Sequence, residues 1–166
     1  MLKKSHIILF GIFLLLGILI SGCGTSAIKN GDTVTLDYTG KLADGSLFDT
    51  SIGGKPLVFT MGAGNMIPGF EKAVLGMKVG DQKTFTIPFS EAYGAYSDNR
   101  IVEISRSQLA PDVVPQAGME LQAAQPDGSI AVVTIKKVYD TTVTIDTNHP
   151  LAGKDLTFEI EILKIE

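Results

Sequence analysis

The sequence is poor in cysteine and histidine, which limits the chemistry it can carry. Of its 166 residues, one is a cysteine, Cys23, and two are histidines, His6 and His149. A lone cysteine excludes a disulfide framework within the chain. No group of cysteine and histidine residues has the spacing of a metal site, so we expect no bound transition metal.

The sequence also lacks an excess of positive charge and a phosphate-binding loop. Removing Lys3 and Lys4 with the N-terminal segment leaves 12 of the 14 basic residues against 18 acidic ones, a formal balance of −6. Nucleic acid is therefore not an expected partner. The glycines at positions 62 and 64 fit neither a GxxxxGK(S/T) nor a GxGxxG pattern, and no Ser/His/Asp triad can be argued. We expect no cofactor.

One hydrophobic run stands near the N-terminus. Lys3 and Lys4 precede an uncharged run from Ile7 to Ile20. The run is short for a helix that must span about 30 Å of hydrocarbon, and its layout is that of a secretory signal. Small residues then precede Cys23, as in the lipobox of a lipoprotein.

These features predict a lipoprotein signal peptide over residues 1–22, lipid attachment at Cys23 and a short tether over residues 23–27. The alternative is an uncleaved signal anchor, in which the cysteine is one more small apolar residue. Both interpretations place the folded part outside the cytoplasm and on a membrane. We therefore expect an extracytoplasmic, membrane-anchored protein.

The part after the signal has the length of one domain, or of one small domain with an insertion. Pro68 fits a first helical turn, and Phe70, Ala73 and Val74 share one face, which predicts one short helix over 68–75. Alternating or short apolar segments predict strands in the rest. These strands cover residues 33–38, 47–48, 57–61, 82–87 and 156–162.

The section between residues 99 and 146 has a different texture. Its short apolar segments are separated by turns rich in proline, glycine and aspartate, which predicts a small β unit with its own turns. The segments are 100–109, 119–122, 129–138 and 142–146, and the turns include Pro126-Asp127-Gly128. We interpret this section as an insertion, and a four-strand extension of the main sheet is the alternative.

Five motifs occur in the order found in one known family. They are Val34-Thr35-Leu36-Asp37-Tyr38-Thr39-Gly40, Asp44-Gly45-Ser46-Leu47-Phe48-Asp49, Ile67-Pro68-Gly69-Phe70-Glu71-Lys72-Ala73, Ala92-Tyr93-Gly94 and Asn148-His149-Pro150-Leu151-Ala152-Gly153-Lys154-Asp155-Leu156-Thr157-Phe158. Over about residues 28–166 the chain resembles FKBP-type peptidyl-prolyl cis-trans isomerases. It is most similar to the SlyD-like branch, which carries an insert-in-flap domain.

The resemblance implies a mainly β, α+β fold: a half-barrel of antiparallel strands wrapped on one short helix. The isomerase domain would be discontinuous, with residues 28–98 and 147–166. Residues 99–146 would be the insert-in-flap domain, which captures unfolded chains and passes prolines to the pocket. The printed sequence has no His- and Cys-rich tail after Glu166 like the one that gives some SlyD-like proteins nickel binding, so we again expect no metal.

The resemblance also implies the site residues. Four would form the catalytic group and five would bind substrate, with Leu57 as the alternative to Phe59. The catalytic group is Tyr38, Asp49, Tyr93 and Phe158, and the substrate-binding group is Phe48, Phe59, Met66, Ile67 and Phe70. The Tyr93 hydroxyl and the Ile67 backbone N–H would hold substrate carbonyls, and Asp49 would lie at the rim.

These implications predict an enzyme that accelerates rotation about X-Pro bonds in folding proteins. Its partners would be unfolded or proline-containing polypeptides and, through the lipid, the membrane, and we expect a monomer. One alternative is a non-catalytic peptide-binding chaperone lipoprotein with a vestigial pocket. A solute-binding lipoprotein is disfavoured, because its two large α/β lobes do not fit the length that remains after the signal.

Overall fold

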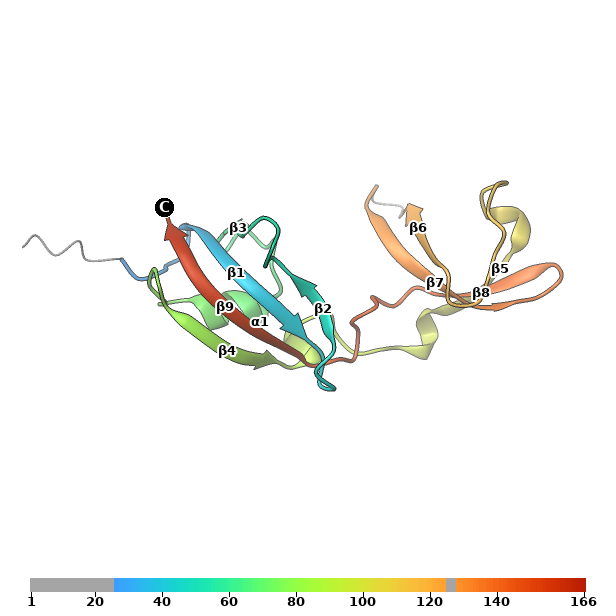
Figure 1. Cartoon of the computed structure of the whole chain (residues 1–166). Coiled ribbons are helices and arrows are strands. Elements are labelled where there is room, and N and C mark those ends of the chain that lie inside the picture. The colour runs from blue at the N-terminus through green and yellow to red at the C-terminus, as the bar shows by residue number, and fades with distance from the viewer. Residues whose placement is uncertain (1–25, 125–127) are drawn as a thin grey trace, which may run out of the picture.

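A computed structural model describes residues 26–124 and 128–166. The predicted signal peptide, Cys23 and part of the turn at 126–128 lie outside the described residues. The described chain is mainly β, with two antiparallel sheets and one short α-helix (Figure 1). The fold class predicted from the sequence is therefore confirmed. No helix within the described ranges is long and apolar enough to cross a membrane.

The first sheet has five strands from both ends of the described chain. The strands are β1 (Thr33–Lys41), β2 (Leu47–Thr50), β3 (Leu57–Thr60), β4 (Gln82–Ile87) and β9 (Leu156–Ile165). They run in the order β2-β1-β9-β4, and β3 pairs with the N-terminal half of β1. The long pairing of β1 with β9 joins residues that are distant in sequence, and buried side chains alternate along both strands.

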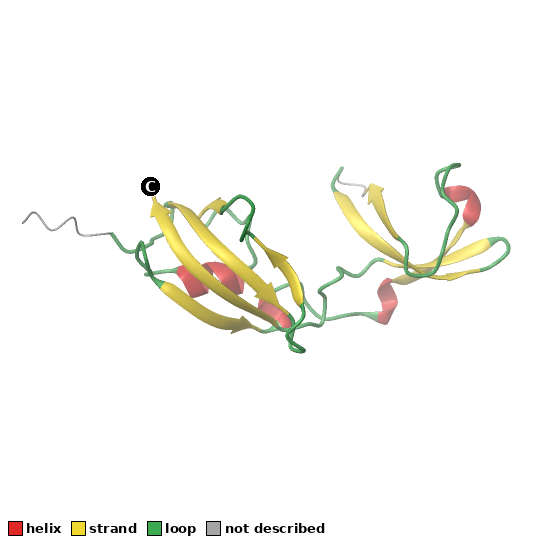
Figure 2. Ribbon diagram, viewed as in Figure 1, coloured by secondary structure: helices red, strands yellow, loops and turns green. Residues whose placement is uncertain are grey.

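The helix α1 (Pro68–Val74) packs against this sheet (Figure 2). Pro68 stands in its first turn, where its missing N–H is not needed, and Gly76 adopts a positive φ of 81° just after its end. Phe70 and Val74 are buried between helix and sheet. The helix therefore ends one residue earlier than the predicted 68–75.

The second sheet is formed by residues 101–146. Its strands are β5 (Ile101–Ser105), β6 (Glu120–Ala124), β7 (Ile130–Val138) and β8 (Thr142–Asp146), in the order β5-β8-β7-β6. Ile135, Val143 and Ile145 form its own small core. Among the described residues, none of these strands pairs with the first sheet, so a four-strand extension of the main sheet is not what the chain forms.

The predicted strand over 100–109 is shorter than expected. Ser105 ends β5 because its hydroxyl accepts a hydrogen bond from the Ser107 N–H and its own N–H donates to the Gln108 side chain. This reciprocal cap begins the 3₁₀ turn η3 (Arg106–Gln108). Two further 3₁₀ turns, η1 (Phe89–Glu91) and η2 (Asp98–Arg100), lie on the segment that leads from β4 to β5. The chain thus reaches the second sheet through one segment and returns to β9 through another (Figure 1).

Candidate active site

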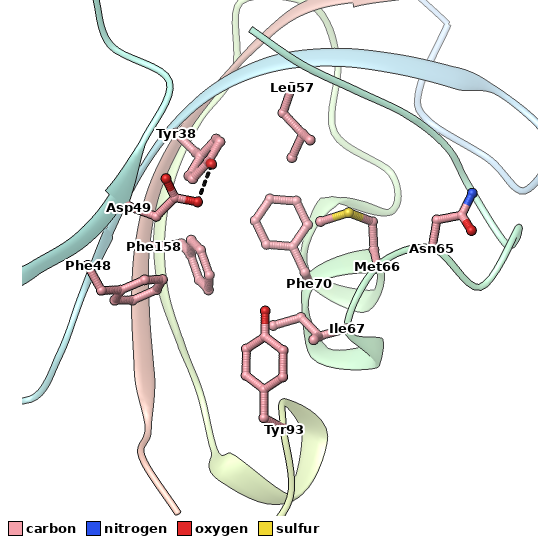
Figure 3. Close-up of a pocket in the computed structure, with 10 residues that line it drawn as sticks. All are labelled: Tyr38, Phe48, Asp49, Leu57, Asn65, Met66, Ile67, Phe70, Tyr93 and Phe158. Atoms are coloured by element: carbon pink, nitrogen blue, oxygen red, sulfur yellow. Dashed lines mark hydrogen bonds between the residues drawn. The ribbon is translucent and has the colours of Figure 1, made fainter. Parts of the chain in front are cut away.

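A pocket of about 220 Å³ opens on the first sheet and its helix (Figure 3). Strands β1, β2, β3 and β9, the start of α1 and the segment after η1 all contribute side chains to it. Its lining is mostly apolar, with a few polar groups. The lining residues are Tyr38, Phe48, Asp49, Leu57, Asn65, Met66, Ile67, Phe70, Tyr93 and Phe158.

The floor of the pocket is a set of aromatic rings packed edge to face. The Phe158 ring centroid lies 5.1 Å from that of Phe70 at 81° and 5.7 Å from that of Phe48 at 87°. The Tyr38 ring lies 6.3 Å from Phe158. Such arrangements bring the positive edge of one ring to the negative face of another. Phe70 and Phe158 are buried, so this floor is a fixed apolar surface.

One wall carries a hydrogen-bonded pair. The Tyr38 hydroxyl donates to the Asp49 carboxylate at 2.6 Å, and the other oxygen of Asp49 accepts from the Thr50 N–H at 2.9 Å. The pairing of β1 with β2, which places Gly40 opposite Asp49, brings the two side chains together. Burial and, after it, the bond to Asp49 raise the pKa of Tyr38 to about 12. At neutral pH the Tyr38 phenol remains protonated and donates to one oxygen of the Asp49 carboxylate.

The Tyr93 side chain enters from the opposite side. It lies just after η1, and its hydroxyl points toward the space above Phe70 and Phe158 (Figure 3). Burial and, second, the charge of Asp49 raise the pKa of Tyr93 above its usual value, so its hydroxyl is also a donor at neutral pH. Ile67 caps the N-terminus of α1, where backbone N–H groups have no partner within the helix.

The family of the chain follows from comparison with known proteins. The family of FKBP-type peptidyl-prolyl cis-trans isomerases matches residues 24–163. The chain belongs to this family. Relatives at 33–40% identity that span most of its length support the same assignment.

Three of these relatives are similar to the isomerase along most of its chain. A short-type peptidyl-prolyl cis-trans isomerase of Methanocaldococcus jannaschii is 40% identical over 154 residues, covering 84% of this chain and 94% of the relative. The FKBP-type 16 kDa isomerase of Escherichia coli is 33% identical, covering 86% and 96%. An FKBP-type isomerase SlyD of Treponema pallidum is 33% identical, covering 83% and 78%. SlyD proteins are thus among its homologues.

Eight of the nine predicted site residues line the pocket of the isomerase. Phe59 does not, and its placement there was wrong. In the pairing of β3 with β1, Leu57 lies opposite Leu36 and Phe59 opposite Val34, farther from Tyr38. Phe59 is therefore buried behind Phe70, with ring centroids 6.0 Å apart, and Leu57 faces the pocket in its place.

Asn65 is the lining residue that the sequence did not indicate. It lies in the turn between β3 and α1, at the edge of the pocket in Figure 3. Asparagine is common in turns that contain glycine, so its presence there did not indicate a site. The one sequence feature that could have indicated it is its position next to Met66.

The isomerase pocket offers apolar surface and hydrogen-bond donors. FKBP-type isomerases bind proline-containing polypeptides. Rotation about a peptide bond meets a barrier of about 18–20 kcal/mol, and unaided X-Pro isomerisation takes tens of seconds or more. In the twisted transition state the amide loses resonance, so its carbonyl carries less charge than in either planar form. A dry aromatic pocket binds that form better than the planar ones, and this difference lowers the barrier without a nucleophile or a proton transfer.

Proposed function

We propose that this isomerase accelerates X-Pro rotation in proteins that fold outside the cytoplasm, and that its second sheet holds unfolded segments of those proteins near the pocket. The observation that carries the proposal is the coexistence of an aromatic pocket with a separate, hollowed β unit on the same chain. The two segments that connect them, residues 88–100 and 147–155, would keep a bound chain within reach of the pocket.

In the pocket, we assign the proline ring to the aromatic floor of Phe70 and Phe158. Leu57, Phe48 and Met66 would complete the apolar wall. The Tyr93 hydroxyl and the Ile67 N–H would donate to the carbonyls on either side of the twisting bond. Asp49, already bonded to Tyr38, would orient the twisting unit at the rim rather than act as an acid or a base.

In the second sheet, the support for chain capture is an apolar hollow of about 380 Å³. Ile104, Leu109 and Leu121 line it beside the small core of the sheet. Val113 contributes to the same hollow, and the neighbouring Val114 is 70% exposed. An exposed apolar hollow of this kind suits the apolar side chains that an unfolded polypeptide exposes.

At the N-terminus, the basic residues, the hydrophobic run and Cys23 support lipid anchoring outside the cytoplasm. One acyl chain holds a protein to a membrane only marginally, and two or more hold it firmly. A diacylglyceryl group on the Cys23 thiol would therefore anchor the enzyme stably. Its clients would be secreted or surface proteins, and we expect it to act on them as a monomer.

The function is tested with a protein whose refolding is limited by proline isomerisation. Catalytic amounts of the chain from Gly24 onward should raise its refolding rate in proportion to the enzyme added. Deleting residues 99–146 should lower this activity strongly while activity on short proline peptides is mostly retained. An equal loss on both substrates would refute chain capture by the second sheet. Suppressed aggregation without any acceleration would indicate a binding chaperone instead.

The anchoring is tested in a bacterial host that processes lipoproteins. The full chain should incorporate labelled fatty acid and partition with membranes, and Cys23→Ser should lose the label. Ser21→Ala, which retains a small residue next to the cysteine, is the matched control and should keep it. Membrane association without any label would favour the uncleaved anchor.

A further inference from the structure

Tyr93 in the pocket wall is stacked flat against a residue that follows the second sheet. The rings of Tyr93 and His149 are parallel to within 2°, and their centroids are 3.7 Å apart. Tyr93 comes from the segment that leads toward the second sheet, and His149 from the segment that returns from it. The His149 imidazole therefore packs against the outer face of the Tyr93 ring, although the two residues are distant in sequence.

The imidazole itself is held in place. Its Nδ1 accepts a hydrogen bond from the Leu151 N–H at 3.1 Å. Burial lowers the pKa of His149 below its usual value, so near neutral pH the ring is uncharged, with its proton on Nε2. A neutral ring with one nitrogen already bonded presents its face to the phenol of Tyr93.

The backbone on both sides of His149 is also fixed to the segment that carries Tyr93. On one side, the Asn148 side chain accepts from the Ser97 N–H at 3.0 Å and donates to the Ser97 carbonyl at 2.9 Å. On the other, the Gly153 N–H donates to the Gly94 carbonyl at 2.8 Å. Because Gly94 directly follows Tyr93, the two stacked rings lie on segments that are clamped together at both ends.

The same imidazole also lines a hollow on the second unit, next to Arg100, Ile130 and Val132. His149 thus lies between the pocket and the second sheet. His149 therefore contacts both the first sheet's pocket wall and the second unit, and it does not line the pocket itself. Any effect it has on the substrate passes through Tyr93.

We propose that His149 is a positioning residue of the isomerase, which fixes the Tyr93 ring so that its hydroxyl points into the pocket. The proposal rests on the role given to Tyr93 in the proposed function. Without the imidazole, the Tyr93 ring loses one face of its support and samples orientations that take the hydroxyl away from the substrate carbonyl. The loss then falls on kcat, since the floor that holds the proline ring is unchanged.

The test compares His149→Ala with His149→Phe in the full chain, kept in solution with a mild detergent, on a short proline peptide. His149→Ala should lower kcat about threefold to tenfold with little change in KM, a range that corresponds to the loss of one aromatic contact. His149→Phe restores a flat ring without the nitrogen atoms and should recover most of the loss. A phenylalanine variant as impaired as the alanine variant would overturn the stacking role, and so would an alanine variant with the activity of the parent.

Tyr93→Ala separates this proposal from the role of Tyr93. If Tyr93→Ala lowers activity and His149→Ala does not, the role of Tyr93 stands and the positioning role falls. If Tyr93→Ala has the activity of the parent, both fall. If both lower activity and the double variant is no worse than Tyr93→Ala, His149 acts through Tyr93. Should a variant fail to fold, contacts between the two rings in NMR spectra of the parent protein decide: their presence supports the stack and their absence overturns it.

Discussion

At the scale of single residues, the burial of Tyr38 and, after it, its bond to Asp49 make the stability of the protein depend on pH in the alkaline range. The folded-state pKa of Tyr38, about 12, is above the ordinary value of 10.0. A group whose pKa is raised on folding contributes stability that is complete below its unfolded pKa and is lost as pH rises through the folded one. Folding therefore loses this contribution between about pH 10 and 12.

We expect Tyr38→Phe to flatten the fall in stability over that interval. The measurement is the urea midpoint of the parent and the variant at pH 9 and at pH 11. The parent should lose more stability between the two values than the variant does. Tyr139→Phe, at a half-exposed position in the second sheet's hairpin, is the matched control and should behave like the parent. Parallel losses in parent and Tyr38→Phe would contradict the prediction.

Gly40 is a second residue whose identity shapes the pocket. A Cβ atom at this position would lie 2.6 Å from Cζ of the Phe48 ring, closer than real Cβ contacts allow. Gly40→Ala should therefore push Phe48 from its edge-to-face contact with Phe158 and lower kcat/KM on a short peptide by about threefold to tenfold. Gly54→Ala, whose new Cβ would meet only the Ser51 carbonyl at 3.4 Å, is the control. Equal activity of both variants would show that Phe48 can move without cost.

At the scale of elements, helix α1 is placed by the contact of Gly69 with the end of β4. A Cβ on Gly69 would collide with the Ile87 side chain and lie 3.3 Å from Glu91. A glycine-to-alanine substitution within a helix usually raises the free energy of unfolding by about 1 kcal/mol. The sign of the measured change therefore shows whether helix propensity or the collision with Ile87 dominates. Overpacking typically costs about 1–3 kcal/mol, and we expect Gly69→Ala to lower the free energy of unfolding. A thermal unfolding midpoint above that of the parent would disprove this account of helix placement.

The elements also show what the sequence could and could not predict. The alternation of apolar and polar residues predicted β9, because one face of that strand is buried and the other faces solvent. The same pattern could not choose between Leu57 and Phe59. Both lie on one side of β3, and only the register of β3 against β1 decides which one reaches the pocket. The end of β5 likewise depends on a local cap at Ser105, which competes with the strand for the same backbone groups.

For the site, the resemblance predicted eight of the lining residues: seven lie within the five motifs, and Met66 directly precedes the third motif. The contact of His149 with Tyr93 could not be foreseen from them. It depends on how the segments that precede and follow the second sheet lie against each other, and neither the period of a strand nor the spacing of a motif contains that information. Contacts between these two connecting segments are properties of the tertiary structure.

At the scale of the whole molecule, the segments that precede and follow the second sheet are joined by a buried carboxylate at the end of β8. Asp146 accepts a hydrogen bond from the Tyr96 hydroxyl at 2.7 Å and from the Asn148 backbone and side chain at 2.9 and 2.7 Å. Lys136 lies 3.6 Å from it. Desolvation pushes the pKa of Asp146 upward, and the hydrogen bonds outweigh it, so the pKa lies below its usual value.

Asp146→Asn should therefore weaken the connection between the two sheets in a way that depends on pH. A carboxylate with a lowered folded pKa contributes stability above its unfolded pKa of about 3.8, and this contribution is lost as pH falls through the folded value. At pH 7 the variant should melt several degrees below the parent, because one of the two acceptor oxygens becomes an NH₂ donor that faces the donors of Tyr96 or Asn148. The difference should shrink as the pH falls below 4. Asp140→Asn, in the exposed turn between β7 and β8, is the control. A difference that is the same at pH 7 and pH 3 would mean that the charge of Asp146 has no part in holding the two sheets together.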